Sequence, residues 1–329
     1  MTRQDAIGMG RAGALSAACF LSSAAVPAIG TVAMLFSPAP VLIFAVGRPD
    51  PNRRAFAAAL IATGLVAVLW SPLVSLNYLF SFGLPTVLIG FMVERRRPFE
   101  AIVAVGACAM FIAMVCAGLI AEGGTAGVVR TIYHDLTQEP FFLGWLLHLK
   151  TGGPQFYKFL RLEPAISPQT QALIVRLVVR LSPALVLLAA ALSVLLSLRV
   201  FWQWAGSRRL SYNLFGDLQR WSAPEWTIWP LLAAGFAWQF VPVPAVKDVA
   251  LNSLVILAAV YFCQGLAIIA YYFQAMKSPR IVRGLIYLIV FAQPELAVIV
   301  CVAGIFDLWI DFRRINSAGP PAHKLERLP

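Results

Sequence analysis

Residues 181–198, with the sequence LSPALVLLAAALSVLLSL, decide the class of fold to which this chain belongs. The stretch contains no charged side chain, and it lies inside a longer apolar block, 173–203. At a rise of about 1.5 Å per residue, a helix of this length covers most of the roughly 30 Å hydrocarbon core of a bilayer. The sequence therefore predicts a transmembrane helix here.

The composition of the chain of 329 residues agrees with a membrane location. Hydrophobic residues make up 60% of the chain and charged residues 12%, with a mean hydropathy of +0.79. In a soluble domain, about half of the residues are hydrophobic and about a quarter are charged. The 26 Lys and Arg residues gather in short clusters at the ends of apolar blocks. This arrangement argues against nucleic acid as a partner and predicts the lipid bilayer as the main one.

Seven further apolar blocks predict an all-α fold, a polytopic transmembrane helical bundle with no soluble domain. They are residues 12–46, 55–72, 74–93, 100–121, 226–243, 249–276 and 281–312. The first block would be about 52 Å long as one helix, and Pro27 and Gly30 interrupt it. The last carries Pro294 near its middle, where proline breaks a helix easily. Splitting both blocks into two spans gives an expected total of eight to ten spans.

The distribution of positive charge predicts the orientation of the chain. With ten spans and an inner N-terminus, most of the 26 Lys and Arg residues face the cytoplasm, as the positive-inside rule requires. The expected location is the bacterial cytoplasmic (inner) membrane, as a multi-pass protein with both termini cytoplasmic.

Two long connections organise the chain. Residues 122–172 form an outer loop that includes PFFLGWLLHLK, which we expect to lie in the membrane interface as amphipathic helices. Residues 205–225 form a basic inner loop that suits anionic headgroups. The expected organisation is an N-terminal helical bundle half, 1–121, the outer interfacial loop, 122–172, and a C-terminal half, 173–329.

A few ionisable and amide side chains lie within or beside the apolar blocks, where polar groups are costly and often functional. Some of them share one face of a helix by their spacing. The candidate ligand-binding residues are Arg176, Arg180, Asn252, Gln264, Gln293, Glu295 and Asp307. Snorkelling of the arginines and hydrogen bonding between helices are alternative explanations for these residues.

Signatures of enzymes and metal sites are scarce in this sequence. GxSxG, HExxH and P-loop motifs are missing, and His134, Asp135 and His148 fit no common zinc spacing. The five cysteines lie inside apolar blocks without a CxxC pair. We expect no catalytic residue, no metal, no cofactor and no intrinsic ATPase activity.

Small residues gather on one side of the first apolar block. Gly13, Ala14, Ala17 and Ala18 permit a close approach of another helix. This face is either a seam within the chain or a docking surface for another membrane protein, and the sequence leaves both open.

The C-terminal end, GIFDLWIDFR at 304–313, resembles the closing motif of the YybS-like family of uncharacterised bacterial inner-membrane proteins. Asn252 followed by Gln264-Gly265-Leu266 is similar to an earlier stretch of the same family. The resemblance covers nearly the whole chain and implies no established activity. The residues that carry the closing motif are Gly304, Asp307, Trp309, Asp311 and Arg313.

The N-terminal half resembles the substrate-binding membrane subunits of energy-coupling-factor vitamin transporters. An alanine-rich first segment is followed by a break and by a second segment that carries prolines. The residues of this pattern are Pro27, Gly30, Pro38 and Pro40. The resemblance implies that the small residues of the first block dock on a transmembrane coupling subunit.

The function expected from these observations is that of an integral inner-membrane protein of transporter-like architecture that binds or passes a small solute. One alternative is a membrane assembly or scaffold protein, which the interfacial segments favour. A second alternative is an intramembrane enzyme acting on lipid-linked substrates. Its chemistry would fall to Arg176, Arg180, Glu295 and Asp307.

Overall fold

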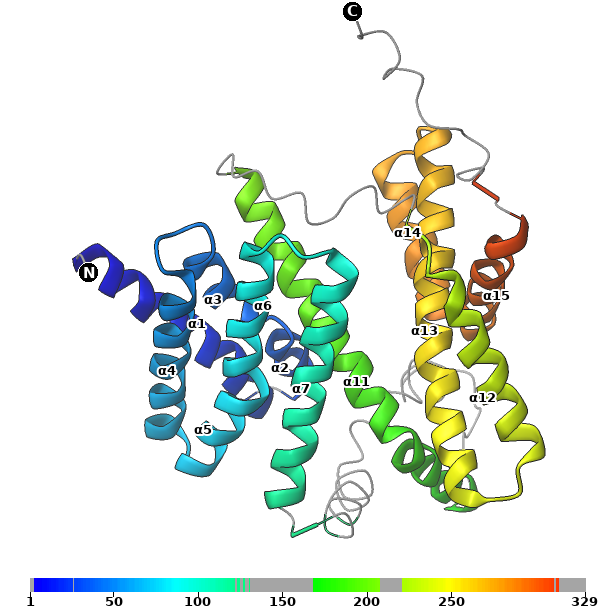
Figure 1. The fold of residues 1–329 in the computed structure, drawn as a ribbon, viewed down its shortest axis with the longest axis horizontal. Coiled ribbons are helices and arrows are strands. Elements are labelled where there is room, and N and C mark those ends of the chain that lie inside the picture. Colours follow the sequence, from blue (N-terminus) through cyan, green and yellow to red (C-terminus); the bar gives the residue numbers. More distant parts are fainter. Residues whose placement is uncertain are drawn as a thin grey trace, which may run out of the picture. The chain divides into compact units, whose positions relative to one another are not determined.

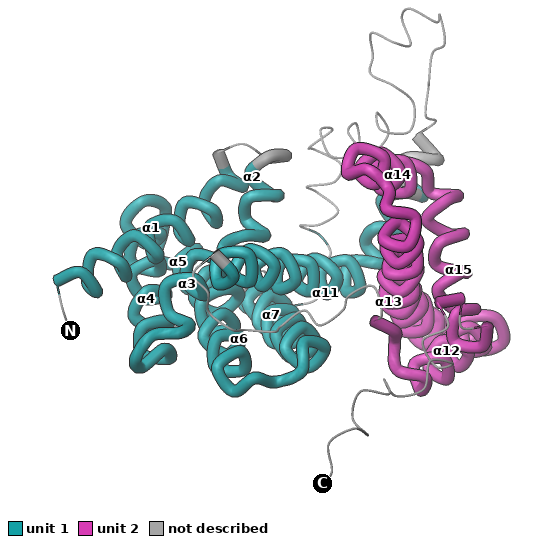
Figure 2. The backbone as a smooth tube through the Cα atoms, turned by 90° about the horizontal axis from the view of Figure 1, so that it is seen from above, with its two compact units in different colours: residues 1–144, 165–214 teal, residues 145–164, 215–329 magenta. Residues whose placement is uncertain are grey.

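The computed structural model of this chain is helical, without strands, over the part that it describes (Figure 1). The described residues are 3–25, 27–121, 123–124, 127, 130, 168–207, 221–310 and 312–313. The chain divides into two compact units, which Figure 2 distinguishes by colour. Unit 1 comprises residues 1–144 and 165–214, and unit 2 comprises residues 145–164 and 215–329.

Unit 1 is built from helices that cross and pack around α1, α3 and α11. Its elements are α1 (Arg3–Ala25), α2 (Pro27–Met34), α3 (Pro38–Ala45), α4 (Pro51–Leu69), α5 (Pro72–Tyr78), the π-helical turn η1 (Leu79–Gly83), α6 (Leu84–Glu94), α7 (Phe99–Ala121) and α11 (Pro168–Ser207). Several of these helices start at a proline. The N–H groups of the first helical turn have no partner within the helix, so the missing N–H of proline removes no helical hydrogen bond there. Helix α1 packs on α4 and α3, and α11 packs on α7 and α3.

The core of unit 1 is made of small and medium apolar side chains. A Cβ atom at Gly13 of α1 would lie 2.9 Å from the carbonyl oxygen of Ala58 in α4, so glycine allows these two helices to touch. Beside this crossing, α3 contributes Val41 and Phe44 to a buried cluster with residues of α1 and α4. Helix α3 therefore packs against both α1 and α4 beside their crossing.

Unit 2 is a smaller bundle around one long helix. Its elements are the 3₁₀ turn η2 (Glu225–Thr227), α12 (Ile228–Phe240), α13 (Pro244–Ala275), α14 (Arg280–Ala292) and α15 (Pro294–Ile310). Helix α13 packs against both α12 and α15, and Figure 1 shows these two helices on the same side of it. Helices α14 and α15 are bent by 103° at the break between them.

The end of α13 is closed by an arginine of α14. The Nε atom of Arg283 donates to the carbonyl of Ser278 at 3.0 Å, and Nη2 donates to the carbonyl of Phe273 at 3.2 Å. A cation beside the last carbonyls of a helix satisfies them and interacts favourably with the helix dipole. Arg283 therefore holds the turn from α13 to α14.

The expected eight to ten spans are not supported. Among the described residues, five helical segments are long and apolar enough to cross a bilayer, and a sixth results if the bent pair α14–α15 counts as one span. The five segments are Pro51–Leu69, Pro72–Glu94, Phe99–Ile120, Val175–Gly206 and Pro244–Ala275. Three of the apolar blocks account for the difference.

In block 12–46, α1 ends before Pro27, as predicted, but α2 and α3 have only eight residues each because the chain turns again at residues 35–37. In block 226–243, α12 has 13 residues, about 20 Å of helix. Block 281–312 breaks where predicted, at Gln293, into segments of 13 and 17 residues. Apolarity alone does not reveal how long a helix remains unbroken.

Helix α11 lies in unit 1, and the division of the chain into an N-terminal and a C-terminal half, 173–329, stays a prediction. The buried α11 residues Val194, Leu198 and Phe201 belong to the core of unit 1, and Ser193 donates to the carbonyl of Leu35 at 2.7 Å. Most of the expected outer loop and most of the inner loop fall outside the described residues, and α11 begins at Pro168, within the expected outer loop.

Two glycines bring α13 and α15 into backbone contact. A Cβ atom on Gly304 would collide with the carbonyl oxygen of Tyr261, and one on Gly265 would collide with the carbonyl oxygen of Val300. Close approach at glycine is typical of helix pairs in membranes, where packing rather than the hydrophobic effect drives association.

We expect Gly304→Ala to lower the stability of unit 2 by about 1–3 kcal/mol, because the added methyl group forces α15 away from α13. The control is Gly284→Ala in α14, where a Cβ atom meets nothing within 4 Å. Thermal unfolding of the purified variants in mild detergent measures the difference. Equal melting temperatures for the two variants would contradict the close-packing argument.

Candidate functional site

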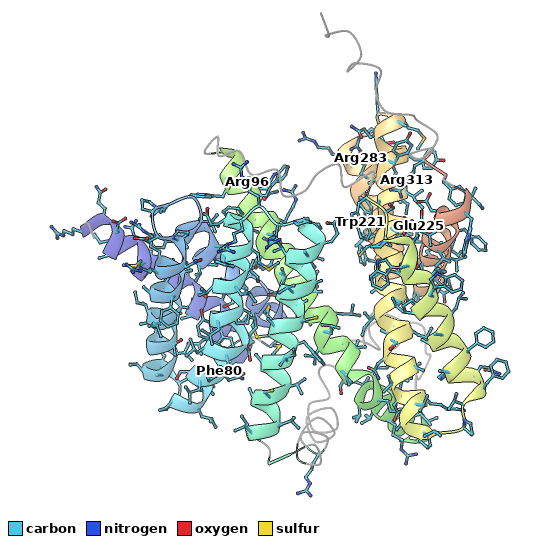
Figure 3. The ribbon with its side chains drawn as sticks, in the orientation of Figure 1. Phe80, Arg96, Trp221, Glu225, Arg283 and Arg313 are labelled. Carbon is cyan, nitrogen blue, oxygen red and sulfur yellow. The ribbon has the colours of Figure 1, made fainter. Side chains whose placement is uncertain are left out.

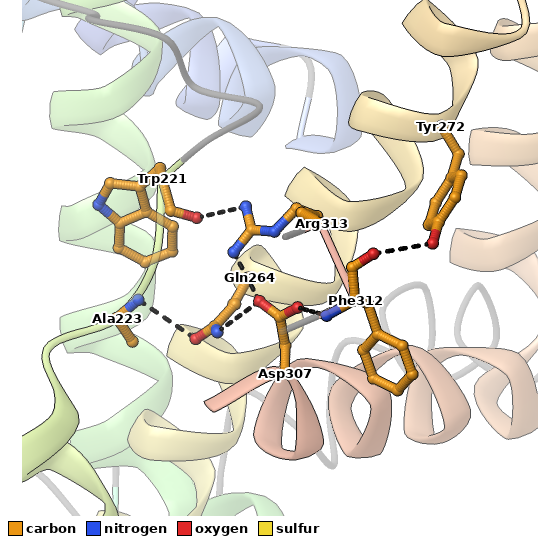
Figure 4. Close-up of polar contacts among 7 residues, drawn as sticks. All are labelled: Trp221, Ala223, Gln264, Tyr272, Asp307, Phe312 and Arg313. Carbon is orange, nitrogen blue, oxygen red and sulfur yellow. Dashed lines mark hydrogen bonds and ion pairs between the residues drawn. The ribbon is translucent and has the colours of Figure 1, made fainter. Parts of the chain in front are cut away.

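A buried polar network lies in unit 2, where α13, the end of α15 and the residues before η2 meet (Figure 4). Its centre is the carboxylate of Asp307. Oδ2 accepts hydrogen bonds from Nη2 of Arg313 at 2.6 Å and from Nε2 of Gln264 at 3.1 Å, and Oδ1 accepts from the N–H of Phe312 at 3.1 Å. The side chains of Arg313 and Asp307 are only 1% and 3% exposed.

The same network includes backbone groups of the residues before η2 and a further side chain of α13. Nη1 of Arg313 donates to the carbonyl of Trp221 at 2.8 Å, and the N–H of Ala223 donates to Oε1 of Gln264 at 3.2 Å. The hydroxyl of Tyr272 donates to the carbonyl of Phe312 at 3.0 Å. A buried ion pair is tolerable only with such additional hydrogen bonds. The network therefore ties the ends of unit 2 to its long central helix.

A second polar cluster lies in unit 1, beside the break between α2 and α3. The hydroxyl of Ser16 in α1 donates to the carbonyl of Ser37 at 2.6 Å and lies 2.6 Å from the hydroxyl of Tyr78. The hydroxyl of Ser37 donates back to the carbonyl of Ser16 at 3.1 Å. Backbone groups freed by a break inside a membrane need partners from neighbouring helices, and the two serines with Ser193 provide them here.

An apolar groove opens beside this break, between α1, α3 and the C-terminal part of α11. Its volume is about 400 Å³, within the range of small-molecule sites. Phe36 of the break lies in its wall with Leu15 and Cys19 of α1. The lining residues with polar groups include Arg11, Arg48 and Trp204. The groove therefore has mostly apolar walls and a basic edge.

The basic edge belongs to one end of unit 1. The N–H of Gly47, after α3, donates to the carboxylate of Glu94 at 2.6 Å, so the turns that follow α3 and α6 lie side by side. The turn after α6 carries three exposed arginines, of which Arg96 is labelled in Figure 3. Arg54 of α4 pairs with Asp5 of α1 at 2.6 Å and brings the start of α1 to this same end.

A family model described as a predicted membrane protein, DUF2232, matches residues 14–128 and 162–308 of the chain. The chain belongs to the DUF2232 family. No curated protein and no solved structure matches it significantly. The match agrees with the prediction of a membrane-protein family with several membrane-spanning helices. It does not confirm the resemblances to YybS-like proteins or to energy-coupling-factor subunits.

Of the candidate ligand-binding residues, the structure of this DUF2232 protein brings together Gln264 and Asp307. Asn252 is half-buried and donates to the carbonyl of Asp248, one turn earlier in α13. The remaining candidates do not join the network. Gln293 and Glu295 are exposed at the bend between α14 and α15, and Arg176 and Arg180 are exposed on α11 of unit 1.

The other singled-out residues have varied positions. In α1, Gly13 and Ala17 are buried, whereas Ala14 and Ala18 are exposed. In the C-terminal motif, Gly304 lies in the close crossing and Trp309 is 64% exposed. Asp311 lies outside the described residues. The small-residue face is thus divided between the interior of unit 1 and its surface, and its role in docking stays a prediction.

Sequence reasoning missed the pairing of Asp307 with Arg313. The two residues are six positions apart, and α15 ends at Ile310, so helical spacing does not predict their contact. The signal that was available is the C-terminal motif, which contains both. Sequence reasoning also missed the Ser16, Ser37 and Tyr78 cluster, because serine and tyrosine are unremarkable in an apolar helix.

We expect Asp307→Asn to destabilise unit 2 by about 3–5 kcal/mol, because Arg313 would then be a buried charge without its counter-charge. Glu295→Gln, at an exposed position of the same helix, should change the stability by less than about 0.5 kcal/mol. Thermal unfolding in detergent distinguishes the two. A stable Asp307→Asn variant would mean that the ion pair is not needed to close the unit.

Proposed function

We propose that this DUF2232 family member binds a small solute within the bilayer, in the groove of unit 1, as part of a transporter-like activity. The observation that carries the proposal is the groove itself. It has a volume of about 400 Å³, and α1, α3 and α11 line it. Binding sites for small molecules are concave and mostly apolar with a few polar groups, and this groove has that composition.

The helix break beside the groove supports the same proposal. Transporter binding sites near the middle of the bilayer are often built around discontinuous helices. The α2–α3 break contributes Phe36 to the wall of the groove. Ser16 and Ser193 hold the carbonyls of Ser37 and Leu35, so the break has a defined geometry. A preformed break lowers the cost of ordering a site when a solute binds.

The arginines at one end of unit 1 support placing that end on the cytoplasmic side of the proposed inner membrane. The turns after α3 and α6 carry Arg48 and Arg95–Arg97, and they lie at the same end. Clusters of arginine in short loops are retained on the cytoplasmic side. The mouth of the groove at Arg48 then opens toward the cytoplasmic leaflet.

The proposal predicts that Leu15→Trp fills the groove and abolishes solute binding. Leu15 lines the groove and is 59% exposed, so a larger side chain is accommodated without disturbing the core. The matched control is Leu60→Trp on α4, where the side chain is 44% exposed and lies away from the groove. Both variants add the same ring to an apolar helix face.

The measurement is mass spectrometry of the small molecules that co-purify with the full chain after extraction from cells in mild detergent. A molecule retained in near-stoichiometric amount by the wild type and Leu60→Trp, and lost from Leu15→Trp, is the expected result. Retention of the same molecule by Leu15→Trp, or no retained molecule in the wild type, would contradict solute binding in this groove.

A further inference from the structure

The groove continues into a wider, charged mouth. This second cavity has a volume of about 780 Å³, and it shares Gly8, Arg11 and Arg48 with the groove. Its other walls carry charged side chains from the start of α1 and α4. They are Asp5 and Arg54. The apolar groove and its charged mouth are thus continuous along α1.

The charges of the mouth do not cancel. Three arginines face one carboxylate there, and that carboxylate, Asp5, is engaged by Arg54 at 2.6 Å. Arg11 and Arg48 are both exposed, and neither forms an ion pair with a described residue. The guanidinium of Arg48 lies 4.5 Å from the centre of the Phe44 ring, which holds it at the edge of the groove. Two arginines therefore remain available to an anion.

The inner part of the cavity requires an apolar occupant. Ala12 and Leu15 of α1 line it together with Ala39 and Ile43 of α3. An acyl chain can pack against such walls without burying a polar group, whereas a hydrated ion would lose its water there without compensation. Trp204 of α11 also lines the groove, and tryptophan is typical of the membrane interface, at the level of the headgroups.

We propose that the occupant is an anionic phospholipid, with its phosphate between Arg11 and Arg48 and one acyl chain along the groove. This inference rests on the proposed function, because it names the chemical class of the solute in the same groove. The arginines provide the charge-assisted hydrogen bonds that phosphate oxygens prefer. The apolar walls then favour a lipid over a free phosphate.

The test is a native mass spectrometry titration of the purified full chain with dioctanoyl phosphatidylglycerol, dioctanoyl phosphatidylcholine and inorganic phosphate. We expect phosphatidylglycerol to bind more tightly than the other two probes. In the double variant Arg11→Gln/Arg48→Gln, its affinity should fall by at least about tenfold, since each arginine near an anionic lipid contributes about a factor of five or more.

The matched control is Arg53→Gln. Arg53 is an exposed arginine at the same end of unit 1 and does not line either cavity. This variant removes one positive charge from the surface without touching the proposed phosphate site. The affinity for phosphatidylglycerol should stay within about twofold of the wild type, so a loss specific to Arg11 and Arg48 supports the proposed contact.

Three other outcomes overturn the inference, and they separate it from the proposed function. Equal binding of both lipids, insensitive to Arg11→Gln/Arg48→Gln but lost in Leu15→Trp, would overturn the charge selectivity and leave solute binding in the groove standing. Binding of inorganic phosphate as tight as that of phosphatidylglycerol would overturn the lipid as the source of the phosphate. Absence of any ligand sensitive to Leu15→Trp would overturn both proposals.

Discussion

The constraint on which the structure depends is that a bilayer offers no hydrogen-bond partners to the backbone. Unbroken helices satisfy this constraint by themselves, but the chain breaks its helices repeatedly, and each break exposes carbonyl groups. Side chains of neighbouring helices meet them: Ser16 and Ser193 at the α2–α3 break, and Arg283 at the end of α13. The breaks are therefore defined turns with fixed partners.

The two units meet this constraint with different chemistry. In unit 1, neutral hydroxyl groups bridge α1, the helix break and Tyr78, and aromatic rings of Phe20 and Phe82 pack around the tyrosine. In unit 2, a carboxylate and a guanidinium bridge the elements instead. Removing these charges from water costs more free energy than burying neutral hydroxyl groups. Of the arginines of unit 1, Arg11 and Arg48 lie exposed at its surface and border the groove.

The sequence predicted the all-helical class and the five long apolar segments because each of them is continuous and free of proline for most of its length. It overestimated the number of spans because α2, α3 and α12 are apolar but short. Gln264 and Asp307 were recognisable as polar groups in apolar surroundings. The groove was not recognisable from the sequence, because alanine and leucine line grooves and cores alike. Only the way in which α3 packs on α1 distinguishes this groove from a core.

The buried network has a consequence for where unit 2 ends along the chain. Trp221 and Arg313 are 92 positions apart and are joined by one hydrogen bond, and Arg313 follows every described helix in the chain. A chain cut between Ile310 and Arg313 would therefore keep every described helix and lose the counter-charge of Asp307. The closure of unit 2 depends on a residue beyond its last described helix, so a domain boundary drawn at Ile310 would leave a carboxylate uncompensated among apolar helices.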